Sequence, residues 1–120
     1  MHIPHGGTVL IDVLIDEGEL DEAWQTAEGL ASPTQWLALA DASAHTRPAD
    51  AARVYQHEVD AHKHITGDGN YLEITKLLIK ARSCHERLGS QTVFAQYVSD
   101  LRTEQKRKRN LMKILNQHHL

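Results

Sequence analysis

The sequence predicts an all-α protein whose helices form antiparallel pairs in a tetratricopeptide-like right-handed superhelix. Apolar residues recur at spacings of three and four along most of the 120 residues, and no alternating run predicts a strand. Glycine, proline and serine stand between these apolar segments, where helices begin and end. A degenerate repeat is typical of such helix pairs: Leu20, Trp24 and Ala27 share the spacing of Phe94, Val98 and Leu101. An irregular helical bundle is the alternative architecture.

The first helix is expected over residues 8–17, with Gly18 as its stop signal. Its apolar residues nearly surround it, namely Val9, Leu10, Ile11, Val13, Leu14 and Ile15. Such a helix should have neighbours on more than one side, and without them we expect weak self-association through residues 8–15. Residues 1–7 are expected to form a disordered N-terminal extension, and residues 8–120 a single helical-repeat domain.

The next two helices have recognisable boundaries. The second is expected over about residues 19–28, ended by Gly29. Its inner stripe consists of Leu20, Trp24 and Ala27. At the start of the third helix Ser32 can cap the chain, Pro33 suits the first turn and Gln35 completes a capping box.

The fourth and fifth helices carry the clearest apolar stripes. Pro48 opens the fourth, whose stripe consists of Ala51, Ala52, Tyr55, Val59 and His62. Residues 67–70 are expected to form a loop. The fifth carries Ile74, Leu77, Leu78, Ala81, Cys84 and Leu88. Gly89 should end it and Ser90 should cap the sixth helix. The large aromatic residues expected to contribute to the core are Trp24, Trp36, Tyr55 and Phe94.

The sixth helix leads into four consecutive cations, Lys106 to Arg109, after which the apolar pattern resumes at Leu111. Lysine and arginine favour helix, but repulsion among neighbouring cations opposes it. The sequence therefore leaves open whether one helix continues through the basic run.

Charge is divided between the two halves of the chain. Residues 1–60 have a net charge of −9 and residues 61–120 of +6, and we expect a dipolar molecule with a basic pole. The residues of this pole that could contact a polyanion or a partner are Arg102, Lys106, Arg107, Lys108, Arg109 and Lys113. No aromatic residues stand among them and no base-reading pattern is present, so a protein partner is favoured over nucleic acid.

Composition predicts a soluble protein of a reducing compartment. Cys84 is the one cysteine, which excludes an internal disulfide and fits the cytoplasm. No long apolar run predicts a membrane span, and residues 1–7 lack the layout of a signal peptide. No nucleophile and base stand in a catalytic arrangement, so we expect no enzymatic activity and no cofactor.

A metal site is also not expected. His57, Asp60 and His64 share one face of the fourth helix and are suitable ligand types. Residues seven apart lie about 10 Å apart along a helix, too far for both histidines to bind one ion easily. An exposed polar face is the favoured interpretation. Cys84 lies on an apolar stripe, where a buried thiol is expected. His62 should pack with one ring nitrogen hydrogen-bonded.

Three segments carry a resemblance to a known family. They are Trp36-Leu37-x-Leu39-Ala40, Pro48-x2-Ala51-x3-Tyr55, and the segment from Leu101 through Glu104 and Lys106-Arg107-Lys108-Arg109 to Leu115. Together they resemble the C-terminal helical region of bacterial SWIM zinc-finger proteins, over roughly residues 8–120. The zinc-binding motif of that family lies upstream and needs several cysteines, so neither the zinc nor the binding by the finger carries over to this chain.

The resemblance implies that this domain belongs to a longer protein. We expect a non-enzymatic interaction or scaffold module, whose partner is another protein or the upstream part of the parent chain. The alternative is a nucleic-acid-associating domain that uses the basic segment Lys106–Arg109.

Overall fold

The computed structural model describes residues 6–120. Seven α-helices and no strand are present in this range, which confirms the all-α prediction for the part described. The helices are α1 (Gly6–Asp16), α2 (Leu20–Ala27), α3 (Pro33–Ser43), α4 (Pro48–His62), α5 (Asp68–Leu88), α6 (Gln91–Glu104) and α7 (Arg109–Gln117). Among them, none combines the length and the apolar character that a membrane span requires.

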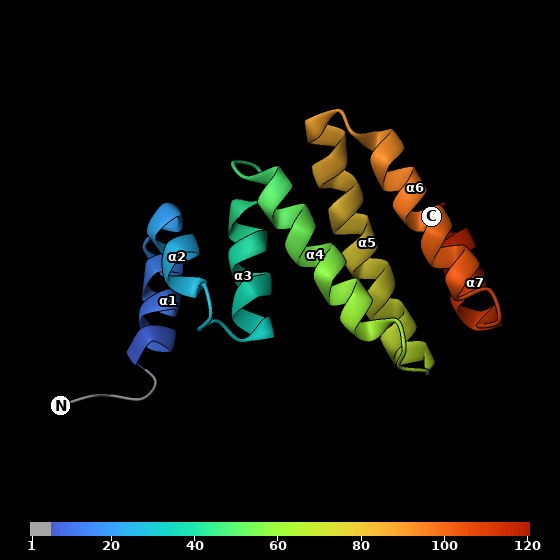
Figure 1. Cartoon of the computed structure of the whole chain (residues 1–120), viewed down its shortest axis with the longest axis horizontal. Coiled ribbons are helices and arrows are strands. Elements are labelled where there is room, and N and C mark those ends of the chain that lie inside the picture. The colour runs from blue at the N-terminus through green and yellow to red at the C-terminus, as the bar shows by residue number, and fades with distance from the viewer. Residues whose placement is uncertain (1–5) are drawn as a thin grey trace.

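The helices line up along an elongated molecule of 52 × 31 × 18 Å (Figure 1). Successive helices alternate in direction, with α1 and α2 at one end of the long axis and α6 and α7 at the other. Helix α3 packs against α2 and α4, and α5 packs against α4, α6 and α7. The acidic N-terminal helices and the basic C-terminal helices therefore lie at opposite ends.

Apolar side chains form two clusters that meet on α3. The N-terminal cluster consists of Ile11, Leu14, Ala23, Ala27 and Leu39. The main cluster spans α3 to α7 and includes Tyr55, Ile74, Leu78, Phe94 and Leu111. Leu39 and its sequence neighbour Ala40 are both fully buried, but Leu39 belongs to the N-terminal cluster and Ala40 to the main one. One turn of α3 thus joins two cores.

All four aromatic residues expected to contribute to the core pack in or against it, but only two are buried. Tyr55 and Phe94 are buried in the main cluster. Trp24 and Trp36 are only half-buried, and they pack at the edge of the N-terminal cluster with ring centroids 5.7 Å apart. Both indoles therefore stay partly exposed at the edge of this cluster.

Local boundary signals are mostly confirmed. Ser32 accepts a hydrogen bond from the Gln35 amide at 3.2 Å, and the Gln35 side chain accepts one from the Ser32 amide at 3.0 Å, which completes the capping box. Gly89 follows α5 in the left-handed conformation with φ of 69°. Ser90 does not cap α6, because its hydroxyl is hydrogen-bonded to the ring of His85 at 2.9 Å.

Two predicted boundaries are wrong. Helix α1 begins at Gly6 rather than residue 8, while residues 1–5 of the predicted extension lie outside the described residues. Helix α5 begins at Asp68, so residues 68–70 of the predicted loop are helical. The reason is Asn70, whose side-chain amide donates to the carbonyls of His62 at 2.8 Å and Ile65 at 2.7 Å. A residue in the first turn of α5 thus provides hydrogen bonds to carbonyl groups at and just after the end of α4.

Helix α1 is buried on one side only. Ile11 and Leu14 are buried against α2 and α3, whereas Val9, Leu10 and Val13 are 59%, 44% and 43% exposed. The expectation of neighbours on more than one side of this helix is therefore unmet within the described chain.

Candidate partner-binding surface at the basic pole

The predicted basic run forms the connection between α6 and α7, and so the continuous helix does not occur. Leu101 is the last buried residue of α6, and Gln105 then leaves the helical conformation with φ of −104° and ψ of 17°. The chain turns through Lys108, whose amide donates to the Gln105 carbonyl at 2.9 Å. The break relieves the repulsion that four adjacent cations would impose on a helix, and it lets Leu111 and Leu115 pack in the main cluster.

Two of the six predicted contact residues are used within the fold. The guanidinium of Arg102 donates to the backbone oxygen of Leu120 at 2.9 Å and to the side chain of Asn116 at 2.7 Å. The ammonium of Lys108 donates to the backbone oxygen of Lys63, at the end of α4. Both side chains are half-buried and tie α6 and α7 to their neighbours. These internal hydrogen bonds leave Arg102 and Lys108 less available to a partner, and their role as partner contacts stays a prediction.

The other four predicted residues, Lys106, Arg107, Arg109 and Lys113, are exposed. We call them the exposed cation set. None of the four makes an ion pair or a side-chain hydrogen bond with residues 6–120. They surround the α6–α7 turn and the start of α7, and their charges face solvent.

Two carboxylates lie near this set, and one of them, Asp68, accepts a hydrogen bond from the side chain of Asn110 at 3.2 Å. The nearest carboxylate in sequence is Glu104, but its oxygen lies 3.0 Å from the ammonium of Lys63. This hydrogen bond lowers the pKa of Glu104 and raises the pKa of Lys63, so the two charges satisfy each other. Helix α7 has no acidic residue in its first turn, and its amino end carries cations where the helix dipole favours anions.

The remaining sequence candidates are dispersed or occupied. His57, Asp60 and His64 are all exposed, and Asp60 accepts a hydrogen bond from the hydroxyl of Tyr97 at 3.0 Å. Within residues 6–120 no three histidine, cysteine or carboxylate side chains are placed to share a metal ion. His62 is half-buried, and its Nδ1 lies 2.9 Å from the side-chain oxygen of Asn70, as predicted.

Cys84 is fully buried, as predicted, and burial raises the pKa of its thiol. Its neighbour His85 is directed elsewhere: one ring nitrogen lies 2.9 Å from the hydroxyl of Ser90 and the other 3.4 Å from the side-chain oxygen of Gln56. Neither residue is placed to activate the other.

No sequence pattern singled out Lys63, which connects the end of α4 to α6 and to the turn between α6 and α7. Its ammonium binds Glu104 of α6, while its carbonyl accepts from Lys108. No local pattern marks this role, since the partners are 41 and 45 residues away.

Comparison of the chain with protein-family models, with curated protein sequences and with solved structures found no match.

Proposed function

We propose that this domain is a non-enzymatic interaction module that presents the exposed cation set to an acidic protein surface. The observation that supports the proposal is the group of unpaired cations at the amino end of α7. An anionic partner would offset both the mutual repulsion and the unfavourable position in the helix dipole. The absence of aromatic residues among the cations favours a protein over a nucleic acid as that partner.

The resemblance to the C-terminal region of bacterial SWIM zinc-finger proteins gives this proposal a context. In such a protein the acidic surface would belong to the upstream part of the parent chain or to a cytoplasmic partner. The order of packing is compatible with a tetratricopeptide-like superhelix, in which α1–α2, α3–α4 and α5–α6 would be the pairs and α7 a capping helix. We propose this assignment as the finer description of the fold.

The proposal can be tested with two polyanions that present different chemistry. Binding to polyglutamate and to a 20-base-pair DNA duplex should be measured by fluorescence anisotropy over a series of salt concentrations. We expect weak, salt-sensitive binding to polyglutamate that is lost in the Lys106→Gln, Arg107→Gln, Arg109→Gln variant. Lys108 is left unchanged in this variant because it stabilises the end of α4.

A matched control removes charge from another surface of the basic half. Lys76 is exposed on α5 and makes no ion pair with residues 6–120, and the Lys76→Gln variant should retain most of the binding. Submicromolar binding of the DNA duplex at physiological salt, lost in the triple variant and kept in the control, would overturn the choice of a protein partner. It would instead establish the nucleic-acid alternative.

A further inference from the structure

A second concave surface lies in the acidic half of the molecule, away from the exposed cation set. It is a groove of about 970 Å³ between α2, the start of α3 and one side of α4. Trp24 and Trp36, the only tryptophans of the sequence, line it. Its acidic lining residues are Glu28, Asp50, Glu58 and Asp60. Against these four carboxylates the lining contains one permanent cation, Arg53, which is paired with Asp50.

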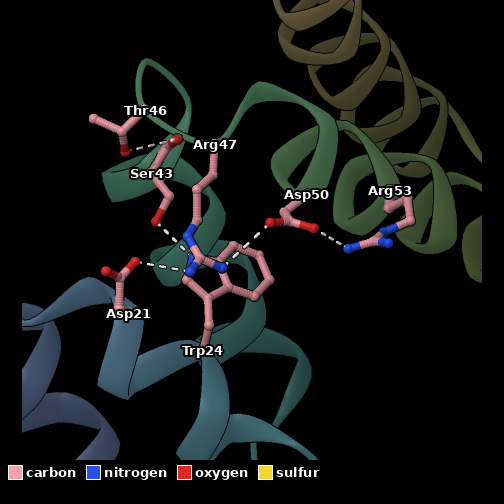
Figure 2. Close-up of polar contacts among 7 residues, drawn as sticks. All are labelled: Asp21, Trp24, Ser43, Thr46, Arg47, Asp50 and Arg53. Atoms are coloured by element: carbon pink, nitrogen blue, oxygen red, sulfur yellow. Dashed lines mark hydrogen bonds and ion pairs between the residues drawn. The ribbon is translucent and has the colours of Figure 1, made fainter.

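Beside the groove, the protein holds one of its own guanidinium groups on Trp24 (Figure 2). The guanidinium of Arg47 lies over the ring of Trp24, 5.7 Å from its centroid. It donates to Asp21 at 2.7 Å and to Asp50 at 3.3 Å, so one guanidinium is held between an indole face and two carboxylates. Trp24 is held in this position by its own N–H, which donates to the hydroxyl of Ser43 at 3.0 Å. Indole faces attract cations, and arginine more often than lysine.

The lining of the groove contains the same kinds of residue: a second indole, Trp36, and two carboxylates that form no ion pair with an arginine or lysine of residues 6–120, Glu28 and Glu58. Glu58 is only 6% exposed, yet its carboxylate makes no hydrogen bond to any of the described residues. Its nearest basic atom is Nε2 of His62, at 3.9 Å. Every fully buried side-chain oxygen among the described residues has a hydrogen-bond partner, so the Glu58 oxygens must remain open to solvent in the groove, where a donor can reach them.

We propose that this groove binds an arginine side chain presented by a peptide segment of a protein partner. The guanidinium would stack on Trp36 and donate to Glu58 and Glu28, in the manner in which Arg47 is held on Trp24. Arginine fits better than lysine, because a planar fork of donors can serve a carboxylate and an aromatic face at once. The volume of the groove exceeds that of one side chain and leaves room for flanking peptide.

The site is distinct from the exposed cation set, which has the opposite charge and shares no residue with the lining of the groove. Its test is therefore independent of the function proposed above. Because both tryptophans line the groove, intrinsic tryptophan fluorescence reports on its occupancy without a label.

The probe is a synthetic peptide, Gly-Gly-Arg-Gly-Arg-Gly-Gly with blocked ends, titrated into the full chain while tryptophan emission is recorded. Calorimetry provides the affinity independently. We expect a saturable change, and at least about tenfold weaker binding when citrulline replaces arginine, since citrulline keeps the shape and loses the charge. Glu28→Gln and Glu58→Gln should each weaken binding of the arginine peptide by about tenfold.

The matched control is Asp16→Asn with Glu17→Gln, which changes charge on the exposed end of α1 outside the groove. This variant should bind nearly as well as the wild type. Circular dichroism establishes that each variant is folded, and Glu28 is exposed, so Glu28→Gln gives a readout even if Glu58→Gln unfolds. Equal binding of the arginine and citrulline peptides, or equal loss in the control and the groove variants, would overturn the proposal.

Measuring the tryptophan fluorescence of the protein without peptide, over a range of protein concentrations, tests whether a second copy of the chain binds the groove. The fluorescence could change with concentration, in a way that Lys106→Gln with Arg107→Gln abolishes. That result would show that the basic turn of a second copy occupies the groove, and it would overturn the assignment to a partner protein.

Discussion

Replacing Leu39 by alanine should destabilise the N-terminal cluster and leave the main cluster nearly as stable as before. Leu39 is fully buried and is one of only three large side chains among the five buried members of the N-terminal cluster, the others being Ile11 and Leu14. A leucine-to-alanine change at such a site costs about 2–5 kcal/mol, with the larger values where neighbours cannot close the cavity. The other two members are Ala23 and Ala27, whose methyl groups have little reach. We therefore expect a cost in the upper half of that range.

This cost should fall on one end of the molecule. The main cluster contains sixteen buried residues and does not include Leu39, so α4 and α5 should stay packed while α1 and α2 detach from α3. Hydrogen exchange with mass spectrometry measures this directly. In the Leu39→Ala protein, amides of α1 and α2 should lose protection by a factor of about 300 or more, whereas those of α5 should change little.

The matched variant is Leu78→Ala, which removes a fully buried leucine of the main cluster. It should lower protection throughout the chain, because α5 packs against α4, α6 and α7. If Leu39→Ala lowered the protection of α5 as much as that of α1 and α2, the two clusters would be one cooperative unit and the reasoning would be refuted.

Three further predictions follow from burial and exposure. Cys84 should react with a thiol reagent far more slowly in the native protein than in denaturant, and equal rates would show that its helix face is open. Leu10→Glu with Val13→Glu should abolish the weak self-association expected of the exposed face of α1, as measured by sedimentation velocity; a wild type that stays monomeric at millimolar concentration would contradict this. Burial, and then hydrogen bonding to Asp41 and Asp60, raises the pKa of Tyr55 and Tyr97 above that of unfolded tyrosine. The contribution of these tyrosines to stability should therefore be fully present below pH about 10 and be lost as the pH rises beyond it. Thermal melts of the wild type and of Tyr55→Phe with Tyr97→Phe should differ in this alkaline slope, and identical slopes would contradict the assignment.

What the sequence predicts well is local. The capping box of Ser32 and Gln35 and the stop at Gly89 depend on residues within one turn of the boundary, and both occur where expected. The start of α5 depends instead on Asn70, which binds the carbonyls of the preceding helix. The residue types from Gly67 to Asn70 are typical of a turn, and a prediction from local sequence cannot anticipate the tertiary contact that Asn70 makes.

The same distinction applies to the candidate surfaces. The sequence identified the cations around the α6–α7 turn, but not that Arg102 and Lys108 would be used inside the fold, since their acceptors come from distant segments. The tryptophan groove escaped prediction altogether. Trp24 and Trp36 lie on apolar stripes that predict core, and a core assignment hides the fact that both indoles stay partly exposed at the edge of the N-terminal cluster.

The break between α6 and α7 also gives this molecule a defined point of proteolytic nicking. Trypsin-like proteases cleave after lysine and arginine in exposed, non-helical segments, and Lys106 and Arg107 stand together in such a segment. After a cut there, α7 would still be held by the burial of Leu111 and Leu115 and by the hydrogen bonds of Arg102 to the C-terminal residues. The two fragments would remain associated under native conditions and separate only on denaturation. The exposed cation set would by then be divided between two separate chains.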